Sequence, residues 1–148
     1  KSIDALANHG SIEVLLCGNN KSLRCIEALS TCPCLTAIDC RDCGISGTAK
    51  NESERKLSVI CSSSCLASLN LNGNPILAQI SEPFRIFCIS KARALQNLNE
   101  IPVLLKERRI SEAYMLRGGR DAAQEEKRKR RGVVNHGKVV KKRPIYSS

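Results

Sequence analysis

Aliphatic and cysteine side chains recur along the chain with a fixed internal spacing. The pattern Leu-x-x-Leu-x-Leu-x-x-Asn/Cys-x-Leu is filled completely by Leu66, Leu69, Leu71, Asn74 and Ile76. It is filled again by Leu35, Ile38, Cys40, Cys43 and Ile45, and more loosely by Ile12, Leu15, Cys17 and Asn20, with Ser22 in the last position. Repetition of this kind indicates a stack of similar units, and it is stronger evidence for the fold than the secondary-structure preference of any single segment.

The distance between copies is uneven. Ile12 and Leu35 are 23 residues apart, which lies within the range of roughly 20–29 residues for this repeat class. Leu35 and Leu66 are 31 residues apart. The excess falls in residues 47–55, a polar run that begins with Gly47. This run predicts a loop-like insertion between a strand and the following helix.

Each copy predicts one short strand. The fourth and sixth positions of the pattern are two residues apart, so their side chains point to the same side of a strand, towards the interior. We therefore expect Leu15, Ile38 and Leu69 to lie side by side on consecutive strands. The Asn at the ninth position can satisfy backbone groups where the chain leaves the strand, whereas Cys43 can do so only weakly.

Helical spacing fills the intervals between the copies. Leu23, Ile26 and Leu29 predict one short helix, and Leu57, Ile60 and Cys61 predict another. Ile3 and Leu6 resemble the end of an earlier helix, so the repeats are expected to continue before Lys1. The fold class predicted is α/β, a leucine-rich-repeat solenoid with short parallel strands on the concave side and helices on the convex side.

The last hydrophobic layer of an open stack needs a cap with a polar outer face. After Asn74-Pro75-Ile76, a helix is expected from Phe84 through Ile86, Ile89 and Ala92, and Leu95-x-x-Leu98-Asn99 resembles an incomplete further strand. The predicted organisation is leucine-rich repeats over residues 1–76, a C-terminal cap over 77–119 and a basic, largely flexible tail over 120–148.

The cap region carries a family resemblance. Asn97-Leu98-Asn99-Glu100-Ile101-Pro102-Val103, Glu107-Arg108-Arg109, Glu112-Ala113 and the run from Arg117-Gly118-Gly119 to Glu126 resemble the leucine-rich-repeat axonemal dynein assembly factor family. The chain departs from that family in its many cysteines, in Ile101 and in the insertion after Gly47. The resemblance implies a protein-binding scaffold for cytoplasmic preassembly of dynein arms, near cilia or flagella, with dynein subunits as partners.

A second resemblance implies a different cellular compartment, the nucleus. Lys106-Glu107-Arg108 and the basic tail are similar to features of the spliceosomal leucine-rich-repeat protein of the branch-site particle. That resemblance implies a nuclear scaffold that holds an RNA-binding protein partner.

Composition narrows the chemistry. The nine cysteines often occupy core positions, which favours a reducing compartment, cytosol or nucleus.

Cys32, Cys34, Cys40 and Cys43 have spacings that could hold zinc, but core packing is the preferred interpretation, so no metal and no cofactor are expected. His9 and His136 are the only histidines, and no catalytic grouping is found, so an enzyme is not expected. No apolar run approaches the roughly 18 residues that cross a bilayer.

Two surfaces are candidates for binding. The predicted concave face carries Glu13, Leu16, Thr36, Asp39, Arg41, Ser68, Asn70 and Asn72, among which Arg41 is the best anchor. The net charge of +10 is concentrated in residues 120–148, which include Lys127, Arg128, Lys129, Arg130 and Arg131. This basic segment is open to three interpretations: a solvated helix end, a nuclear-localisation or nucleic-acid patch, or an arm for an acidic protein surface such as tubulin tails or a chaperone.

Overall fold

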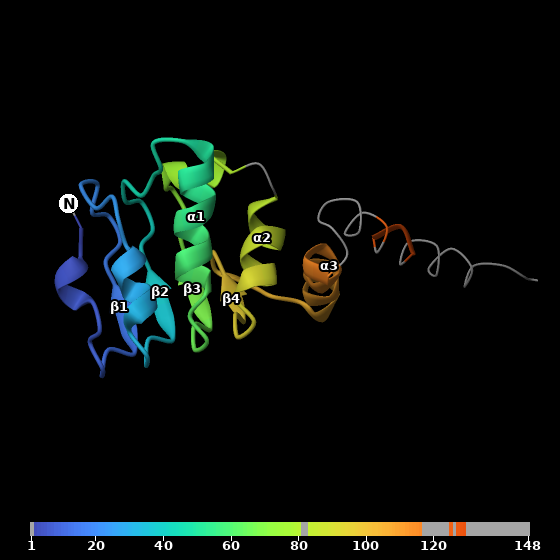
Figure 1. The fold of residues 1–148 in the computed structure, drawn as a ribbon, viewed down its shortest axis with the longest axis horizontal. Coiled ribbons are helices and arrows are strands. Elements are labelled where there is room, and N and C mark those ends of the chain that lie inside the picture. Colours follow the sequence, from blue (N-terminus) through green and yellow to red (C-terminus); the bar gives the residue numbers. More distant parts are fainter. Residues whose placement is uncertain (1, 81–82, 117–124, 126, 130–148) are drawn as a thin grey trace, which may run out of the picture.

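The computed structural model describes residues 2–80, 83–116, 125 and 127–129. Its centre is one five-stranded sheet whose strands follow each other in chain order (Figure 1). The strands are β1 (Val14–Leu16), β2 (Ala37–Asp39), β3 (Ser68–Asn70), β4 (Asn97–Leu98) and β5 (Ile101–Pro102). The first four strands are parallel, and β5 pairs with β4 in the antiparallel direction.

The register of the strands is the one that the repeat predicts. Leu15 pairs with Ile38, and Ile38 pairs with Leu69. Leu69 pairs in turn with Leu98 of β4, so the row of aliphatic side chains continues for one more strand. Ile38, Leu69 and Leu98 are each at most 3% exposed. The core is therefore a set of aliphatic and cysteine layers that is continuous from strand to strand.

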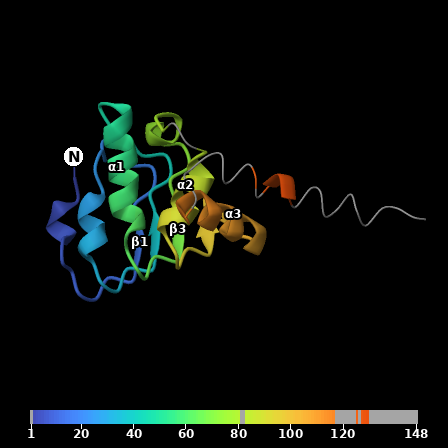
Figure 2. The same cartoon turned by 45° about the vertical axis from the view of Figure 1, so that its right-hand side comes forward.

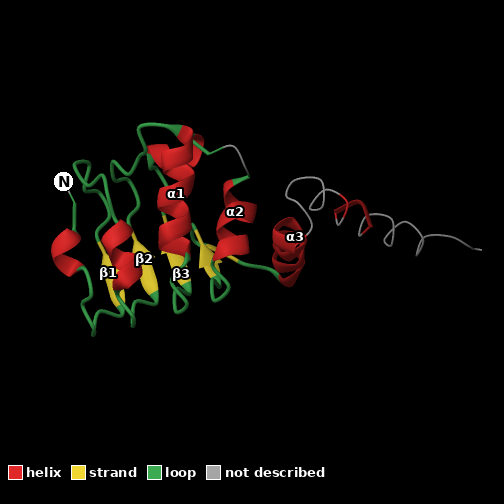
Figure 3. Ribbon diagram, in the orientation of Figure 1, coloured by secondary structure: helices red, strands yellow, loops and turns green. Residues whose placement is uncertain are grey.

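Helices cover one face of this sheet (Figures 2 and 3). They are η1 (Asp4–Leu6), η2 (Glu27–Thr31), α1 (Lys50–Cys61), η3 (Pro75–Ala78), α2 (Phe84–Lys91) and α3 (Leu105–Leu116), where η marks a 3₁₀ helix. Contacts run from η1 to η2, from η2 to α1, from α1 to α2 and from α2 to α3. The helices thus form a second layer in the same order as the strands. Among the described residues, no helix combines the length and apolar character needed to cross a membrane.

The predicted loop-like insertion over residues 47–55 is wrong, because α1 already begins at Lys50. The extra residues lengthen the helix and leave only a short connection before it. Glu52 accepts hydrogen bonds from the Thr48 amide and hydroxyl and pairs with Lys56 one turn later. Ser53 is fully buried, and its hydroxyl contacts Gln79 Oε1 at 3.0 Å. Polar side chains that bond within the first turn stabilise a helix start.

Each of the three full strands is followed by one residue with a left-handed backbone. These residues are Asn19 (φ 63°), Asp42 (φ 50°) and Gly73 (φ 70°), each four positions after the central residue of its strand. Asn, Asp and Gly tolerate this conformation better than other residues do. The residue that comes next is the turn residue of the repeat: Asn20, Cys43 or Asn74. The side chain of Asn74 donates to the carbonyl of Cys40 and accepts from the amide of Ile45.

The fourth strand turns early. After Leu98 the chain reverses at Asn99 (φ 52°) and Glu100 (φ 65°), the two-residue turn of a tight hairpin. The returning strand β5 lies outside β4 and carries Pro102, which pairs with Asn97. Because proline has no amide hydrogen, it does not extend the ladder to a further strand. The incomplete strand predicted at Leu98-Asn99 is confirmed, and the hairpin covers its outer edge.

Helix α3 is held to α2 and to this hairpin by three charged side chains. Arg85 donates to Glu107 and to the carbonyls of Leu98 and Pro102. The guanidinium of Arg108 binds the carbonyl oxygens at the end of α2 and beyond it, those of Ile89, Ala92 and Leu95. The pKa of Glu107 is lowered, first by its hydrogen bond with Arg85. The Glu107-Arg108 pair of the family resemblance therefore has a structural role in the cap.

Candidate functional site

The face of the sheet opposite the helices is free of covering elements in the described part of the chain. We call it the open face, and it carries the side chains that alternate with the core row: Val14, Leu16, Ala37, Asp39, Ser68 and Asn70. On β1 it exposes two large aliphatic side chains, Val14 at 56% and Leu16 at 76%. On β2 and β3 it is polar. The open face therefore combines an apolar edge with a hydrogen-bonding centre.

A shallow depression of about 270 Å³ lies on this face. It is lined by Leu16, Ala37, Ile38, Asp39, Arg41, Ser68, Asn70 and Glu100. Five of the eight residues predicted for the concave face line it: Leu16, Asp39, Arg41, Ser68 and Asn70. The tertiary structure thus brings side chains from three strands and from the cap hairpin to one place.

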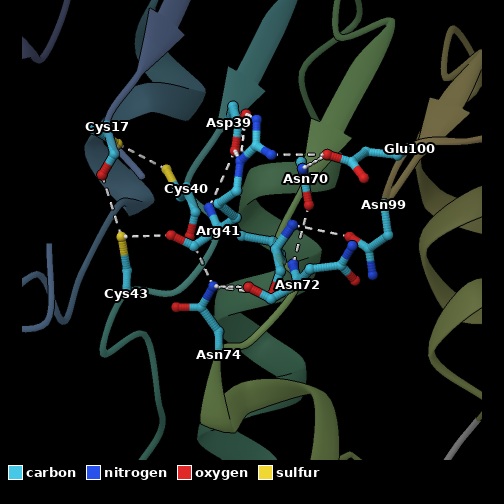
Figure 4. Close-up of polar contacts among 11 residues, drawn as sticks. Cys17, Asp39, Cys40, Arg41, Cys43, Asn70, Asn72, Asn74, Asn99 and Glu100 are labelled. Carbon is cyan, nitrogen blue, oxygen red and sulfur yellow. Dashed lines mark hydrogen bonds and ion pairs between the residues drawn. The ribbon is translucent and has the colours of Figure 1, made fainter. Parts of the chain in front are cut away.

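Arg41 is at the centre of the charges in the depression (Figure 4). Its Nη2 lies 2.6 Å from Asp39 Oδ2, and its Nη1 lies 3.0 Å from Glu100 Oε1. The pKa of Arg41 is raised, chiefly by the hydrogen bond with Asp39. Two carboxylates on one guanidinium leave carboxylate oxygens with remaining acceptor capacity. The site can therefore receive a donor or a cation as well as an apolar side chain next to Leu16.

Glu100 was not predicted for this face. Its Oε1 also accepts from Asn70 Nδ2 at 3.2 Å, so the hairpin turn is tied to β3. The neighbouring turn residue Asn99 accepts from the amide of Leu71 at 2.8 Å. A signal was present in the sequence, because Asn99-Glu100 interrupts the aliphatic pattern directly after Leu98. Only the early reversal of the chain, however, brings Glu100 beside Arg41.

The comparisons with known proteins bear on the fold. No protein-family model matches the sequence, and no curated protein matches it. Among solved structures, the chain is similar to a leucine-rich-repeat protein in the crystal structure of the Drosophila melanogaster SNF/U2A' complex. The TM-score is 0.63 at 22% sequence identity, and the match covers 84% of this chain and 68% of that chain. This chain has a leucine-rich-repeat-like fold. At this sequence identity, the similarity shows the fold alone and does not identify a partner of this chain.

The other three residues predicted for the concave face, Glu13, Thr36 and Asn72, lie at the margin of the open face. Glu13 and Thr36 are exposed and directly precede β1 and β2, where the Thr36 hydroxyl donates to the Glu13 carbonyl at 3.1 Å. Asn72 is exposed, and its backbone N–H donates to Asn70 Oδ1. These three residues do not line the depression. Asn70 itself is only 6% exposed, so it supports Glu100 more than it offers a contact.

The cysteines do not gather as a metal site. Cys34 is exposed, whereas Cys32 is buried with its thiol at 3.0 Å from the Leu6 carbonyl. Cys43 donates to the carbonyl of Cys17, so it does serve the turn, with a longer and weaker contact than Asn74. Among the residues that the structure describes, no group of three His, Cys, Asp or Glu side chains could hold a metal ion.

The basic segment is only partly described. Lys127, Arg128 and Lys129 are exposed, and Lys129 pairs with Glu125 at 2.7 Å. Arg130, Arg131 and the remainder of the predicted tail lie outside the described residues, as do Gly118 and Gly119 of the family resemblance. The three interpretations of the tail therefore stay predictions.

Proposed function

We propose that the chain is a non-catalytic protein-binding scaffold and that the open face is its contact surface. The observation that carries the proposal is the depression in which exposed Leu16 lies beside the Asp39–Arg41–Glu100 ion pairs. Protein interfaces typically combine an apolar anchor with a polar rim, and arginine is frequent among their most important residues. The proposal includes a curved solenoid with this face on its concave side.

The assembly served is proposed from the resemblances. The first candidate is cytoplasmic preassembly of axonemal dynein arms, which rests on the cap sequence from Asn97 to Glu126. The cap residues Glu107 and Arg108 are occupied by structural bonds, so they support the cap and carry no information about its partner.

The second candidate is a nuclear scaffold that holds an RNA-binding protein. It is supported by the structural neighbour, which was solved as the SNF/U2A' complex. The open face is the contact surface proposed for both candidates, so it can be tested before the assembly is known.

A variant pair tests the contact surface. Leu16→Glu places a negative charge in the apolar part of the depression, and Asn51→Glu places one at an exposed position of α1, on the helix side of the sheet. Partners captured by tagged wild-type chain in cells should be lost with Leu16→Glu and kept with Asn51→Glu. Equal capture by both variants, with both chains folded by circular dichroism, would exclude the open face.

Localisation distinguishes the two assemblies. A fluorescently tagged chain in nuclear speckles supports the spliceosomal candidate. A cytoplasmic chain whose depletion removes dynein arms supports the dynein candidate, and a source genome without cilia excludes it.

A further inference from the structure

Two thiols of neighbouring strands are in direct contact. Cys17 Sγ lies 3.0 Å from Cys40 Sγ, and the dashed line between them in Figure 4 joins consecutive repeats. The residues before them, Leu16 and Asp39, are paired in the sheet, and the Cys17 amide donates to the Asp39 carbonyl at 2.8 Å. The two backbones are therefore held at the separation of adjacent strands, about 4.8 Å.

That separation fits a covalent bond. A disulfide spans Cα atoms about 4.4–6.8 Å apart and needs its sulfurs at about 2.05 Å. The sulfurs of Cys17 and Cys40 thus have to approach by about 1 Å, which side-chain rotation can provide without moving the strands.

The two thiols differ in access and in acidity. Cys17 is partly exposed, whereas Cys40 is fully buried. The pKa of Cys17 is lowered, chiefly by its hydrogen bond with the Cys40 thiol, and the same contact raises the pKa of Cys40. The more accessible sulfur is therefore also the better nucleophile, since the thiolate is the reactive form.

We propose that Cys17 and Cys40 are an oxidation site, at which a peroxide converts the thiol pair to a reversible intrachain disulfide. The Cys17 thiol gives up its proton, and the thiolate attacks one peroxide oxygen, so the O–O bond breaks and a sulfenic acid forms. The departing hydroxide takes up the proton that the Cys17 thiol released and leaves as water. The Cys40 sulfur then attacks the sulfenic sulfur and displaces hydroxide, which leaves as water with the Cys40 proton. In total, two thiols and one hydrogen peroxide give one disulfide and two waters.

The other cysteines lack this combination. Cys34 and Cys65 are exposed, but neither has the adjacent thiol contact that joins Cys17 and Cys40. Cys61 and Cys88 are close enough to interact, but both are fully buried. The Cys43 thiol points to the carbonyls of Cys17 and Arg41, that of Cys32 to the Leu6 carbonyl, and that of Cys25 to the Glu27 carboxylate. The structure thus favours a single linkage among the nine cysteines.

The linkage would have a defined mechanical effect. It would join β1 to the neighbouring strand β2 by a covalent bond. Leu16 and Asp39 directly precede the two thiols and line the depression. The disulfide would therefore lock, by a covalent bond, the spacing between the apolar and the charged part of the open face that strand pairing already sets.

Peptide mapping of the full chain tests the site. The reduced chain is treated with a low excess of hydrogen peroxide, free thiols are alkylated, and the digest is analysed by mass spectrometry. We expect a peptide pair joined through Cys17 and Cys40, lost on reduction, in the wild type and in the control Cys34→Ser. It should be absent from Cys17→Ser.

Thermal unfolding gives a second readout. Closing this loop should raise the Tm of the oxidised chain by roughly 5–10 °C over the reduced chain. The rise should be retained in Cys34→Ser and absent in Cys17→Ser. Linkage of Cys17 to Cys43, mixed linkages through Cys34 and Cys65, or a sulfinic Cys17 without any linkage would overturn the proposal. If Cys17→Ser does not fold, the wild-type map alone decides.

Discussion

The Arg41 guanidinium and the Glu100 carboxylate meet at 3.0 Å across 59 residues of sequence. Arg41 follows the second strand of the sheet, whereas Glu100 is in the turn that ends the fourth. The contact brings a charged cap residue to the depression of the open face. In the hairpin turn, Glu100 has a left-handed backbone that a glutamate rarely adopts.

Strain at Glu100 is the first testable feature. Glu100→Ala and Glu100→Gly both remove the exposed ion pair, which is worth at most about 1 kcal/mol. Alanine keeps the unfavourable left-handed backbone, which costs roughly 1–2 kcal/mol, and glycine does not. Chemical denaturation should therefore find Glu100→Gly more stable than Glu100→Ala by about 1 kcal/mol. Equal stabilities would show that the turn is unstrained.

Arg108 is predicted to stabilise the cap. Its guanidinium binds three backbone carbonyls between Ile89 and Leu95, and alanine would leave these acceptors without their charged donor. Arg108→Ala should lower the free energy of unfolding by about 2–4 kcal/mol in urea titration. The exposed neighbour Arg109 is a matched control, because Arg109→Ala should change it by less than about 0.5 kcal/mol. Similar losses for both would contradict the role of Arg108.

The Glu52 carboxylate is expected to make a contribution to the stability of the fold that is lost at acidic pH. Its pKa is lowered from 4.5 to about 2, first by the Thr48 hydroxyl, then by the Thr48 amide and Lys56. The ionised carboxylate therefore stabilises the fold fully above pH 4.5, and this contribution is lost as the pH falls towards about 2. Glu52→Gln should lower Tm at about pH 6 and approach the wild type at about pH 3.

The control for Glu52 is Glu112→Gln, at an exposed position of α3. It should leave the difference in Tm between the two pH values close to that of the wild type. A Glu52→Gln deficit that is constant with pH would assign the effect to packing instead of charge.

The fourth prediction concerns the buried hydroxyl of Ser111 and its effect on the free energy of unfolding. Its hydroxyl is fully buried and has no hydrogen-bond partner among the described residues. Burying an unpaired hydroxyl costs free energy, so Ser111→Ala should raise the free energy of unfolding by about 1 kcal/mol. Ser90, whose hydroxyl donates to the Phe87 carbonyl at 2.7 Å, is the control, and Ser90→Ala should not be stabilising. A destabilised Ser111→Ala would mean that the hydroxyl does find a partner in solution.

Sequence periodicity determined the main lines of the fold. The spacing of Leu15, Ile38 and Leu69 predicted which residues would be paired, because a two-residue alternation allows only one of the two faces of each strand to be buried. The helical positions Leu29 and Leu57 were predicted from the three-to-four-residue spacing of a helix and are buried. The polar run from Lys50 to Arg55 was misread as a loop, because polar composition alone does not distinguish a solvated helix turn from a loop.

Only the tertiary structure decided how the site is put together. The contacts between Arg41 and Glu100, and between Cys17 and Cys40, depend on the register of neighbouring strands and on the early turn at Asn99. A repeat pattern fixes which residues face the core, since burial of apolar surface is periodic along the chain. It does not fix which polar residues meet across strands, because those distances arise only when the separate repeats are stacked.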